Sequence, residues 1–392
     1  MNDQSHMQGE GPIIKLLHTT TPDPSDADLE KEEIDPNSRL MEKPFDPTKI
    51  NIETKIPSLE TLIKRIKSNT VQLNTESYFQ KYNDLWDEVK QSLLIESILI
   101  RFPLQAFFFD ATEDSNWLVV DGLQRLSSIK NFAVKKSLKL THLEFLPHLE
   151  GKGWDDLTDD LHRLIEETQV VIYKIMPGTP TDVKFNIYKR INTGGLILEP
   201  QEIRHALFQG RPAEFIAELA ISEAFINATN GKIKTHRMLD RYFSNRFLCF
   251  YLFGYQNYLS DLDTYMSKAM ASIYDKTDDE LNKINEDFCA SMNLCHVIFG
   301  EEAFRKVYKD NEQLPPVNKA IFDGLSTQIA LLNQSERELL KTKKKEFKAS
   351  FKYLLANDEE FFTSVTSSTG DRNRVINRHS KIENLISFLI HK

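Results

Sequence analysis

The chain has 392 residues, of which 40% are hydrophobic and 27% charged, and its formal net charge is −9. This composition is typical of a soluble globular protein with a substantial core, and no apolar run reaches the roughly 18 residues that a membrane-spanning helix needs. The negative charge disfavours a general nucleic-acid binder. The three cysteines form no paired framework and the first residues show no secretory signal, so we expect a cytoplasmic protein without a membrane partner.

The charge is unevenly distributed along the chain. Residues 1–50 contain 11 acidic and 5 basic residues, together with many Pro, Ser and Asp. Such a segment has too little to bury, and we expect a disordered acidic arm there. Residues 336–392 contain 8 acidic and 12 basic residues. Its KTKKKEFK stretch at 341–348 can contact phosphates, and a solvated helix face is the alternative interpretation.

A small mixed α/β module is predicted for residues 51–180. Ordered structure is expected to begin near Lys55. Its expected elements, in chain order, are a capped helix from Leu59 to Ile66, a helix from about Trp86 to Ile100, strands at 105–110 and 116–120, a helix from Leu123 to about Val134, and a strand at 169–176. Pro103 and Pro177-Gly178 follow elements that they terminate.

Residues 181–392 are predicted to form a larger, helical module. The clearest helical periodicity lies at 237–253, 279–299, 318–332 and 373–390. The expected fold class is therefore α+β, with an α/β domain first and a mostly α-helical domain after it.

The stretch WLVVDGLQRLSSI (117–129) breaks an apolar strand at Asp121-Gly122 and restarts as a helix. The free amides and the dipole at the start of such a helix favour anions, phosphate above all. Arg125 in the first turn opposes that dipole unless an anion neutralises it, and a guanidinium binds phosphate in a fork. Asp121 can hold Mg²⁺ or orient a water. A structural clamp between Asp121 and Arg125 is the alternative.

A second candidate region is FNIYKRINTGGLILEPQEIRHAL (185–207). A helix is expected to stop at Asn192-Thr193-Gly194-Gly195, and Lys189 and Arg190 precede this flexible glycine pair. The arrangement can form a loop that closes on a phosphate, or it can be an ordinary connection between two helices. Glu202 and His205 have the spacing of paired metal ligands, but surface chemistry is the commoner role without a second such pair.

DGLQR after a strand resembles the DGQQR signature of a bacterial family with a ParB/sulfiredoxin-like fold. This family includes the N-terminal domain of the GmrSD type IV restriction enzymes and SspE-related defence proteins. QSLLIESILIRFPLQAFFF (91–109) and YKRINTGGLILEPQEIRHAL (188–207) resemble further landmarks of the family in the same order. The resemblance implies a ParB-like nucleotide-binding domain at 51–180.

The resemblance also implies nucleotide chemistry at particular residues. Asp121, Gln124 and Arg125 would be catalytic, and Asp121 would also hold the metal. The residues implied to bind nucleotide are Gly122, Gln80, Arg190, Asn192, Gly194 and Gly195. Arg246 and Arg305 lie in helical motifs that also match the family, and they can reach the implied nucleotide site. A role in salt bridges is the alternative.

The expected function is that of a nucleotide-binding, NTP-hydrolysing component of a DNA restriction or anti-phage defence system, with Mg²⁺ as cofactor. The expected partners are a nucleoside triphosphate, DNA and a separate nuclease subunit, because the scattered histidines form no HNH-type cluster. Leu123 replaces the first Gln of DGQQR, and Lys81 replaces an Arg of the family. These departures favour one alternative, a non-catalytic interaction module gated by NTP or DNA. A DNA-nicking or DNA-cleaving enzyme is the other.

Overall fold

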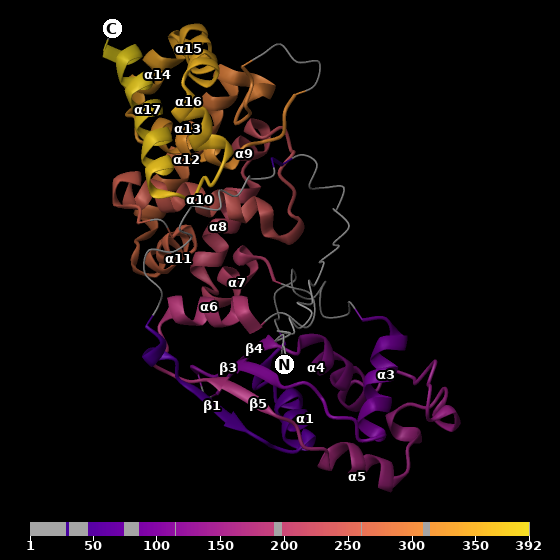
Figure 1. The fold of residues 1–392 in the computed structure, drawn as a ribbon. Helices are drawn as coiled ribbons and strands as arrows, with labels where there is room; N and C mark the ends of the chain where they lie inside the picture. Colours follow the sequence, from indigo (N-terminus) through magenta and orange to yellow (C-terminus); the bar gives the residue numbers. More distant parts are fainter. Residues whose placement is uncertain are drawn as a thin grey trace, which may run out of the picture.

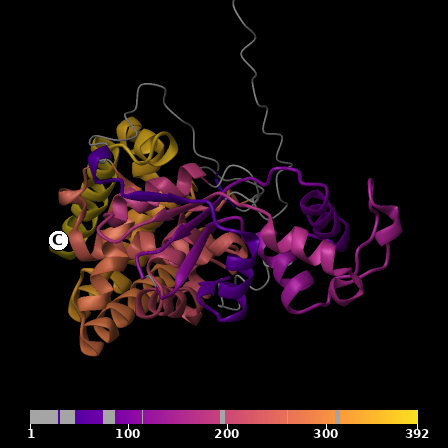
Figure 2. The same cartoon turned by 90° about the horizontal axis from the view of Figure 1, so that it is seen from below.

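The computed structural model describes residues 29–30, 46–73, 86–113, 115–191, 198–259, 261–308 and 314–391. A small sheet with its own helices occupies the part of the chain before residue 180, and the part after it is helical (Figure 1). In the view from below, the sheet module lies in front of the helical module (Figure 2). The predicted α+β class is confirmed. No helix among these residues combines the length and the apolar character needed to cross a membrane.

The sheet is mixed and has five strands in the order β1-β5-β3-β4-β2. The strands are β1 (Ile52–Lys55), β2 (Val71–Gln72), β3 (Phe107–Asp110), β4 (Trp117–Asp121) and β5 (Ile172–Ile175). β3 runs antiparallel to β4 and parallel to β5, and the register between β3 and β4 shifts at Phe108/Phe109. The three predicted strands are confirmed. β1 and β2 were not predicted because β1 is mostly exposed and β2 has two residues, so neither carries a clear apolar alternation.

Four helices share one core with one face of the sheet. They are α1 (Leu59–Lys67), α3 (Glu88–Leu99), α4 (Leu123–Ile129) and α5 (Asp159–Glu167). α4 continues through a π-helical turn to Val134, as far as the sequence predicts. Phe107 and Phe109 of β3 and Trp117 of β4 point into the core that these helices form. The apolar contacts of this core therefore fix the position of the turn between β4 and α4.

The other face of the sheet is covered by α6 (Thr181–Ile191), with α7 (Pro200–Leu207) beside it. Val120 and Ile175 from the sheet pack with Val183 and Ile187 of α6 and Ile203 of α7. The first two helices after residue 180 thus share a core with the strands.

The remaining helices form a second and larger core. They are α8 (Arg211–Ile221), α9 (Glu223–Ala228), α10 (Leu239–Phe253), α11 (Leu262–Ser272), α12 (Asp278–Phe299), α13 (Lys319–Ala330), α14 (Gln334–Thr342), α15 (Lys344–Asn357), α16 (Glu359–Thr366) and α17 (Arg372–His391). α13 is buried from Ala320 to Ala330 and contacts α10, α12, α16 and α17. The four helices that the sequence predicts most clearly are confirmed.

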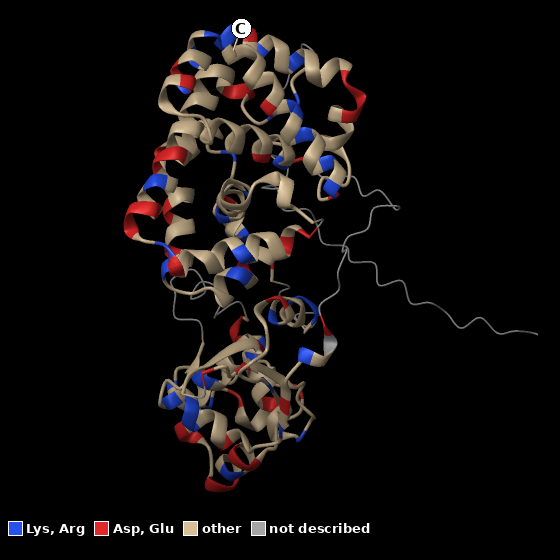
Figure 3. Ribbon diagram, turned by 90° about the vertical axis from the view of Figure 1, so that its left-hand side faces the viewer, with Lys and Arg blue, Asp and Glu red and all other residues tan. Residues whose placement is uncertain are grey.

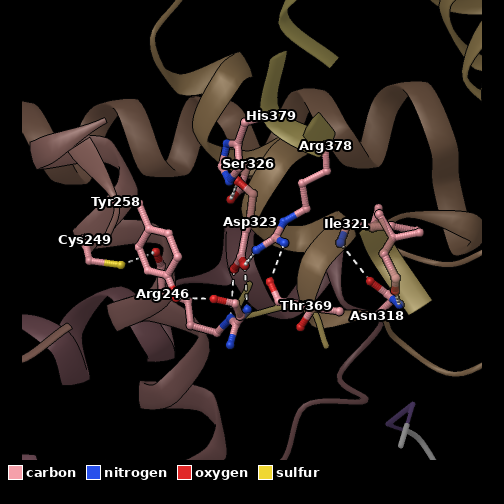
Figure 4. A network of polar contacts seen from close by, with 12 residues as sticks. Arg246, Cys249, Tyr258, Asn318, Ile321, Asp323, Ser326, Thr369, Arg378 and His379 are labelled. Atoms are coloured by element: carbon pink, nitrogen blue, oxygen red, sulfur yellow. Dashed lines mark hydrogen bonds and ion pairs between the residues drawn. The ribbon is translucent and has the colours of Figure 1, made fainter. Parts of the chain in front are cut away.

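A group of charged side chains lies inside this second core (Figure 4). The Asp323 carboxylate on α13 accepts Nε (2.8 Å) and Nη2 (2.5 Å) of Arg246 and Nη2 (3.2 Å) of Arg378. Arg378 also donates to the carbonyl oxygen of Thr369 at 2.5 Å. One carboxylate therefore pairs with two buried guanidinium groups, from α10 and α17.

Asp323→Asn should destabilise the fold by about 3–5 kcal/mol, because both guanidinium groups lose their buried counter-charge. The free energy of unfolding from urea titration measures this change. Asp278→Asn is the matched control, since Asp278 pairs with Arg211 at the exposed surface. Equal unfolding midpoints for the two variants would contradict the role given to Asp323.

His379 adds a pH dependence to this core. Its ring is fully buried between Phe250 and Tyr255, and burial lowers its pKa well below the ordinary value, with Arg378 and Arg246 acting in the same direction. The unfolded chain binds a proton at His379 near the ordinary pKa of about 6.5, whereas the folded chain does not. The folded state is thus favoured above this pH and loses stability as the pH falls below it.

The free energy of unfolding should therefore decrease between pH 7 and pH 5, and His379→Gln should make this decrease smaller. Urea titrations at several pH values measure the slope. His148→Gln, at an exposed histidine, should leave the slope unchanged. An identical slope in wild type and His379→Gln would show that His379 does not carry the effect.

Candidate functional site

The β4–α4 turn brings four of the predicted site residues together. β4 ends at Asp121, Gly122 has a positive φ of 99°, and α4 begins at Leu123. Arg125 follows in the first turn of α4, so that its side chain returns to Asp121 four residues earlier. The turn has the strand–glycine–helix form that the sequence predicts.

The guanidinium of Arg125 is enclosed by groups of the protein. Nη2 lies 3.1 Å from Oδ2 of Asp121 and donates to the carbonyl oxygen of Ala106 at 3.2 Å, while Nη1 donates to that of Gln105. The guanidinium carbon lies 4.6 Å from the ring centroid of Phe107, and the residue is 8% exposed. Burial lowers the pKa of Arg125, and the charge of Asp121 opposes this shift. These contacts are those of the clamp that was the alternative interpretation.

Gly122 is required by the packing as well as by the backbone. A Cβ atom at this position would lie 2.5 Å from Cδ1 of Phe107 and 3.3 Å from Nη2 of Arg125. The glycine therefore lets the turn approach the Phe107 ring that also supports Arg125. The nucleotide-binding role that the family resemblance implies for Gly122 stays a prediction.

Gln124 and Asp121 face other surroundings. The side-chain oxygen of Gln124 accepts the backbone N–H of Trp86 at 3.3 Å, which joins α4 to the residues that precede α3. The Asp121 side chain is 22% exposed, and one of its two oxygens is used by Arg125. Asp121 is thus the anionic group of the turn that solvent can reach.

The other predicted site residues divide into two groups. Arg190 is exposed in the last turn of α6 and forms no ion pair with the residues that the structure describes. α6 itself contacts β4. Gln80, Asn192, Gly194 and Gly195, as well as Lys81, lie outside the described residues. Their role at the turn stays a prediction.

A polar group that the sequence analysis missed lies at the end of β3. The Asp110 carboxylate accepts Nζ of Lys184 at 2.9 Å and the hydroxyl of Tyr188 at 3.0 Å, both from α6. Its other oxygen accepts the N–H of Thr112 at 2.9 Å. Burial raises the pKa of Tyr188, and the neighbouring Asp110 charge adds to the shift. The acid that ends FFFD and the i, i+4 spacing of Lys184 and Tyr188 were the available signals.

The polar residues of α7 hold helices together. Glu202 accepts the N–H of its own N-cap residue and pairs with Arg237 at 2.7 Å. Arg204 pairs with Asp263 of α11, and Nδ1 of His205 lies 3.2 Å from Nη1 of Arg241. In the described part of the chain, no three His, Cys, Asp or Glu residues are grouped as metal ligands.

The two arginines that were candidates for the cleft also have structural contacts. Arg246 pairs with buried Asp323, as described above. Arg305 donates from Nε to the carbonyl oxygen of Glu301 at 3.1 Å and from Nη1 to that of Pro315. Grooves of about 810 and 540 Å³ lie between α15 and α17 and between α12 and α14, and neither is lined by a residue of the β4–α4 turn.

A magnesium ion at the turn would have one protein carboxylate. Mg²⁺ keeps several waters and is commonly held by one or two carboxylates together with substrate phosphates. The partly exposed Asp121 fits this mode of binding, while the absence of a grouped ligand set in the described residues does not fit an ion enclosed by protein ligands alone.

Comparison with known proteins identifies this part of the chain. Residues 59–209 match the family model described as GmrSD restriction endonuclease, N-terminal domain. The matched range extends from α1 through α7, so it continues past the predicted boundary at 180 and includes both helices on the second face of the sheet. No curated protein and no solved structure gave a match.

The match confirms the family resemblance that DGLQR suggested. Residues 59–209 are similar to the N-terminal domain of GmrSD restriction endonucleases.

Gly122→Ala should destabilise the protein more than Gly178→Ala. Both glycines have positive φ (99° and 89°), which costs an L-residue about 1–2 kcal/mol. A Cβ at Gly178 would meet nothing within 4 Å, whereas one at Gly122 meets Phe107. The clash should add about 1–3 kcal/mol for Gly122 alone. Urea titration of the two variants measures the difference, and equal losses would mean that Phe107 yields without cost.

Proposed function

We propose that this chain is the nucleotide-binding component of a DNA restriction or anti-phage defence system, and that it binds a nucleoside triphosphate with Mg²⁺ beside the β4–α4 turn. The observation that carries the proposal is the placement of DGLQR, within a GmrSD-like domain, at a strand-to-helix turn whose carboxylate is partly exposed. The first amides of such a helix lack intrahelical acceptors and favour phosphate.

The contacts of the turn support specific roles for its residues. Asp121 would hold the Mg²⁺ that bridges the phosphates, through the oxygen that Arg125 leaves open. Arg125 is a positioning residue in this proposal, because its guanidinium fixes Asp121 and closes the turn. This differs from the direct phosphate contact that the sequence suggested.

Arg190 supplies the exposed cation that Arg125 does not. It lies in the last turn of α6, which packs on the face of the sheet beside β4, and it forms no ion pair with a described acidic side chain. A guanidinium in this position can stabilise phosphate charge. Slow hydrolysis is proposed, since Leu123 replaces an amide and the Gln124 oxygen already accepts the Trp86 N–H.

A non-catalytic module in which nucleotide only controls partner binding is the second candidate. The enclosed state of Arg125 favours it, since a committed guanidinium cannot follow charge that develops on a transferring phosphoryl group.

A nicking or cleaving enzyme has less support. Basic and acidic residues are interspersed over both modules (Figure 3). Glu302 also pairs with two lysines of the basic C-terminal end, Lys348 (3.1 Å) and Lys352 (3.0 Å).

Nucleotide binding with a panel of NTPs and Mg²⁺, measured by calorimetry, tests the proposal. Arg190→Ala should weaken binding of the preferred NTP about tenfold or more, because a charge-assisted phosphate contact contributes roughly 1.5–3 kcal/mol. Asp121→Asn should remove the dependence on Mg²⁺. Arg163→Ala changes an exposed arginine of α5 and is the matched control.

Phosphate release from the same samples separates the two candidates. Release that disappears in Asp121→Asn supports hydrolysis, and binding without release supports the non-catalytic module. If no NTP binds the wild type, or if Arg190→Ala and Arg163→Ala bind equally, the nucleotide site is not at this turn.

A further inference from the structure

Two residues of the acidic arm, Leu29 and Glu30, lie against the helical module, nearly 290 positions away in the sequence. The backbone N–H of Glu30 donates to the carbonyl oxygen of Val317 at 3.1 Å, and Leu29 forms a parallel bridge with the same residue. Val317 also bridges Arg305 in antiparallel orientation. Leu29 and Glu30 therefore add one β-bridge and one backbone hydrogen bond to an existing pair of backbone segments.

The helical module presents a matched set of groups to the Glu30 carboxylate. Nδ2 of Asn318 donates to one oxygen at 2.8 Å, and Lys306 forms an ion pair with the other. Asn318 is 4% exposed, and its side chain also donates to the carbonyl oxygen of Val365 and accepts the N–H of Ile321. The contacts with Val365 and Ile321 thus hold the Asn318 side-chain amide in place independently of the arm.

Lys306 is held in place in a similar way. Its side chain is 14% exposed and its Nζ lies 5.3 Å from the ring centroid of Phe362, a distance at which an aromatic face attracts a cation. Leu29 is partly buried against the large helical core. The contact combines an apolar residue, a backbone pairing and a carboxylate with two donors, which is the pattern of peptide recognition by strand addition.

The backbone that receives the arm is itself fixed. Arg305, 5% exposed, donates to the carbonyl oxygens of Glu301 and Pro315 on the two sides of this segment pair. The N–H of Asn318 donates to the carbonyl oxygen of Phe304 at 2.8 Å. The site does not depend on the arm for these contacts.

We propose that Val317, Asn318 and Lys306 form a binding site for an extended apolar-acidic peptide, and that the chain's own Leu29-Glu30 occupies it in cis. The acidic arm is then a ligand of the helical module. Recognition depends on the carboxylate of Glu30, since both its oxygens have a donor. This inference is independent of nucleotide binding at the β4–α4 turn.

Limited trypsin digestion of the full chain tests the proposal at the peptide bond after Lys31, the residue that follows Glu30. A protease must take up the residues next to the bond as an extended strand, and docking of Leu29 and Glu30 withholds two of them. A synthetic peptide of residues 24–36 gives the rate for the free sequence. Mass spectrometry should show cleavage after Lys31 several-fold slower in the full chain than in the peptide.

Lys306→Met should raise the rate after Lys31 toward that of the peptide and leave cleavage after Lys15 unchanged. Lys268→Met, at an exposed lysine of α11, is the matched control and should change neither rate. Glu30→Gln, compared with its own Gln peptide, tests the carboxylate without altering the helical module. Equal rates in wild type and peptide, or a wild-type rate after Lys31 in both variants, would overturn the proposal.

Discussion

The guanidinium of Arg125 closes the turn on which the GmrSD-like domain is organised. It joins three parts of the chain: the carboxylate at the end of β4, the carbonyls of Gln105 and Ala106 before β3, and the first turn of α4. The Phe107 ring packs against this guanidinium and leaves room only for a glycine at position 122. A cation near the start of a helix opposes the helix dipole, and here a carboxylate and two carbonyl dipoles offset that cost. The DGLQR motif therefore stabilises the β4–α4 turn, and Asp121 is its partly exposed residue.

The two modules are joined by contacts that are more specific than apolar packing. Asp110 at the end of β3 binds two side chains of α6, and Arg204 of α7 pairs with Asp263 of α11. α6 and α7 thus connect the sheet to the helical core through partly or fully buried charges. Removing one partner of such a pair leaves the other without compensation, so these contacts select one arrangement of the modules. The family match continues past residue 180 to residue 209, so it includes both connecting helices.

Much of the fold could be predicted from periodicity, while the partners of polar residues could not. The strand at 116–120, the turn at Gly122 and the long helices carry local signals in their own residues. Arg125 shows the limit: its charge and position suggested an anionic ligand, but Gln105 and Ala106, some twenty residues earlier, already supply acceptors. Asp110 and Lys184 were missed for the same reason, since only the packing of α6 on the sheet brings them together. Arg190 forms no ion pair with the described residues, and its role at the turn stays a prediction.

The contact of Glu30 with Val317 and Asn318 has a topological consequence. Glu30 is bound to the helical module, and the next described residue, Asp46, lies six residues before β1 of the sheet module. The hydrogen bonds of Glu30 to Val317 and Asn318 close a ring that runs through both modules, and the rest of the ring is the covalent backbone. The sixteen peptide steps between these residues can reach at most about 55 Å. Any opening of the two modules must stay within that reach or first break the hydrogen bonds at Val317.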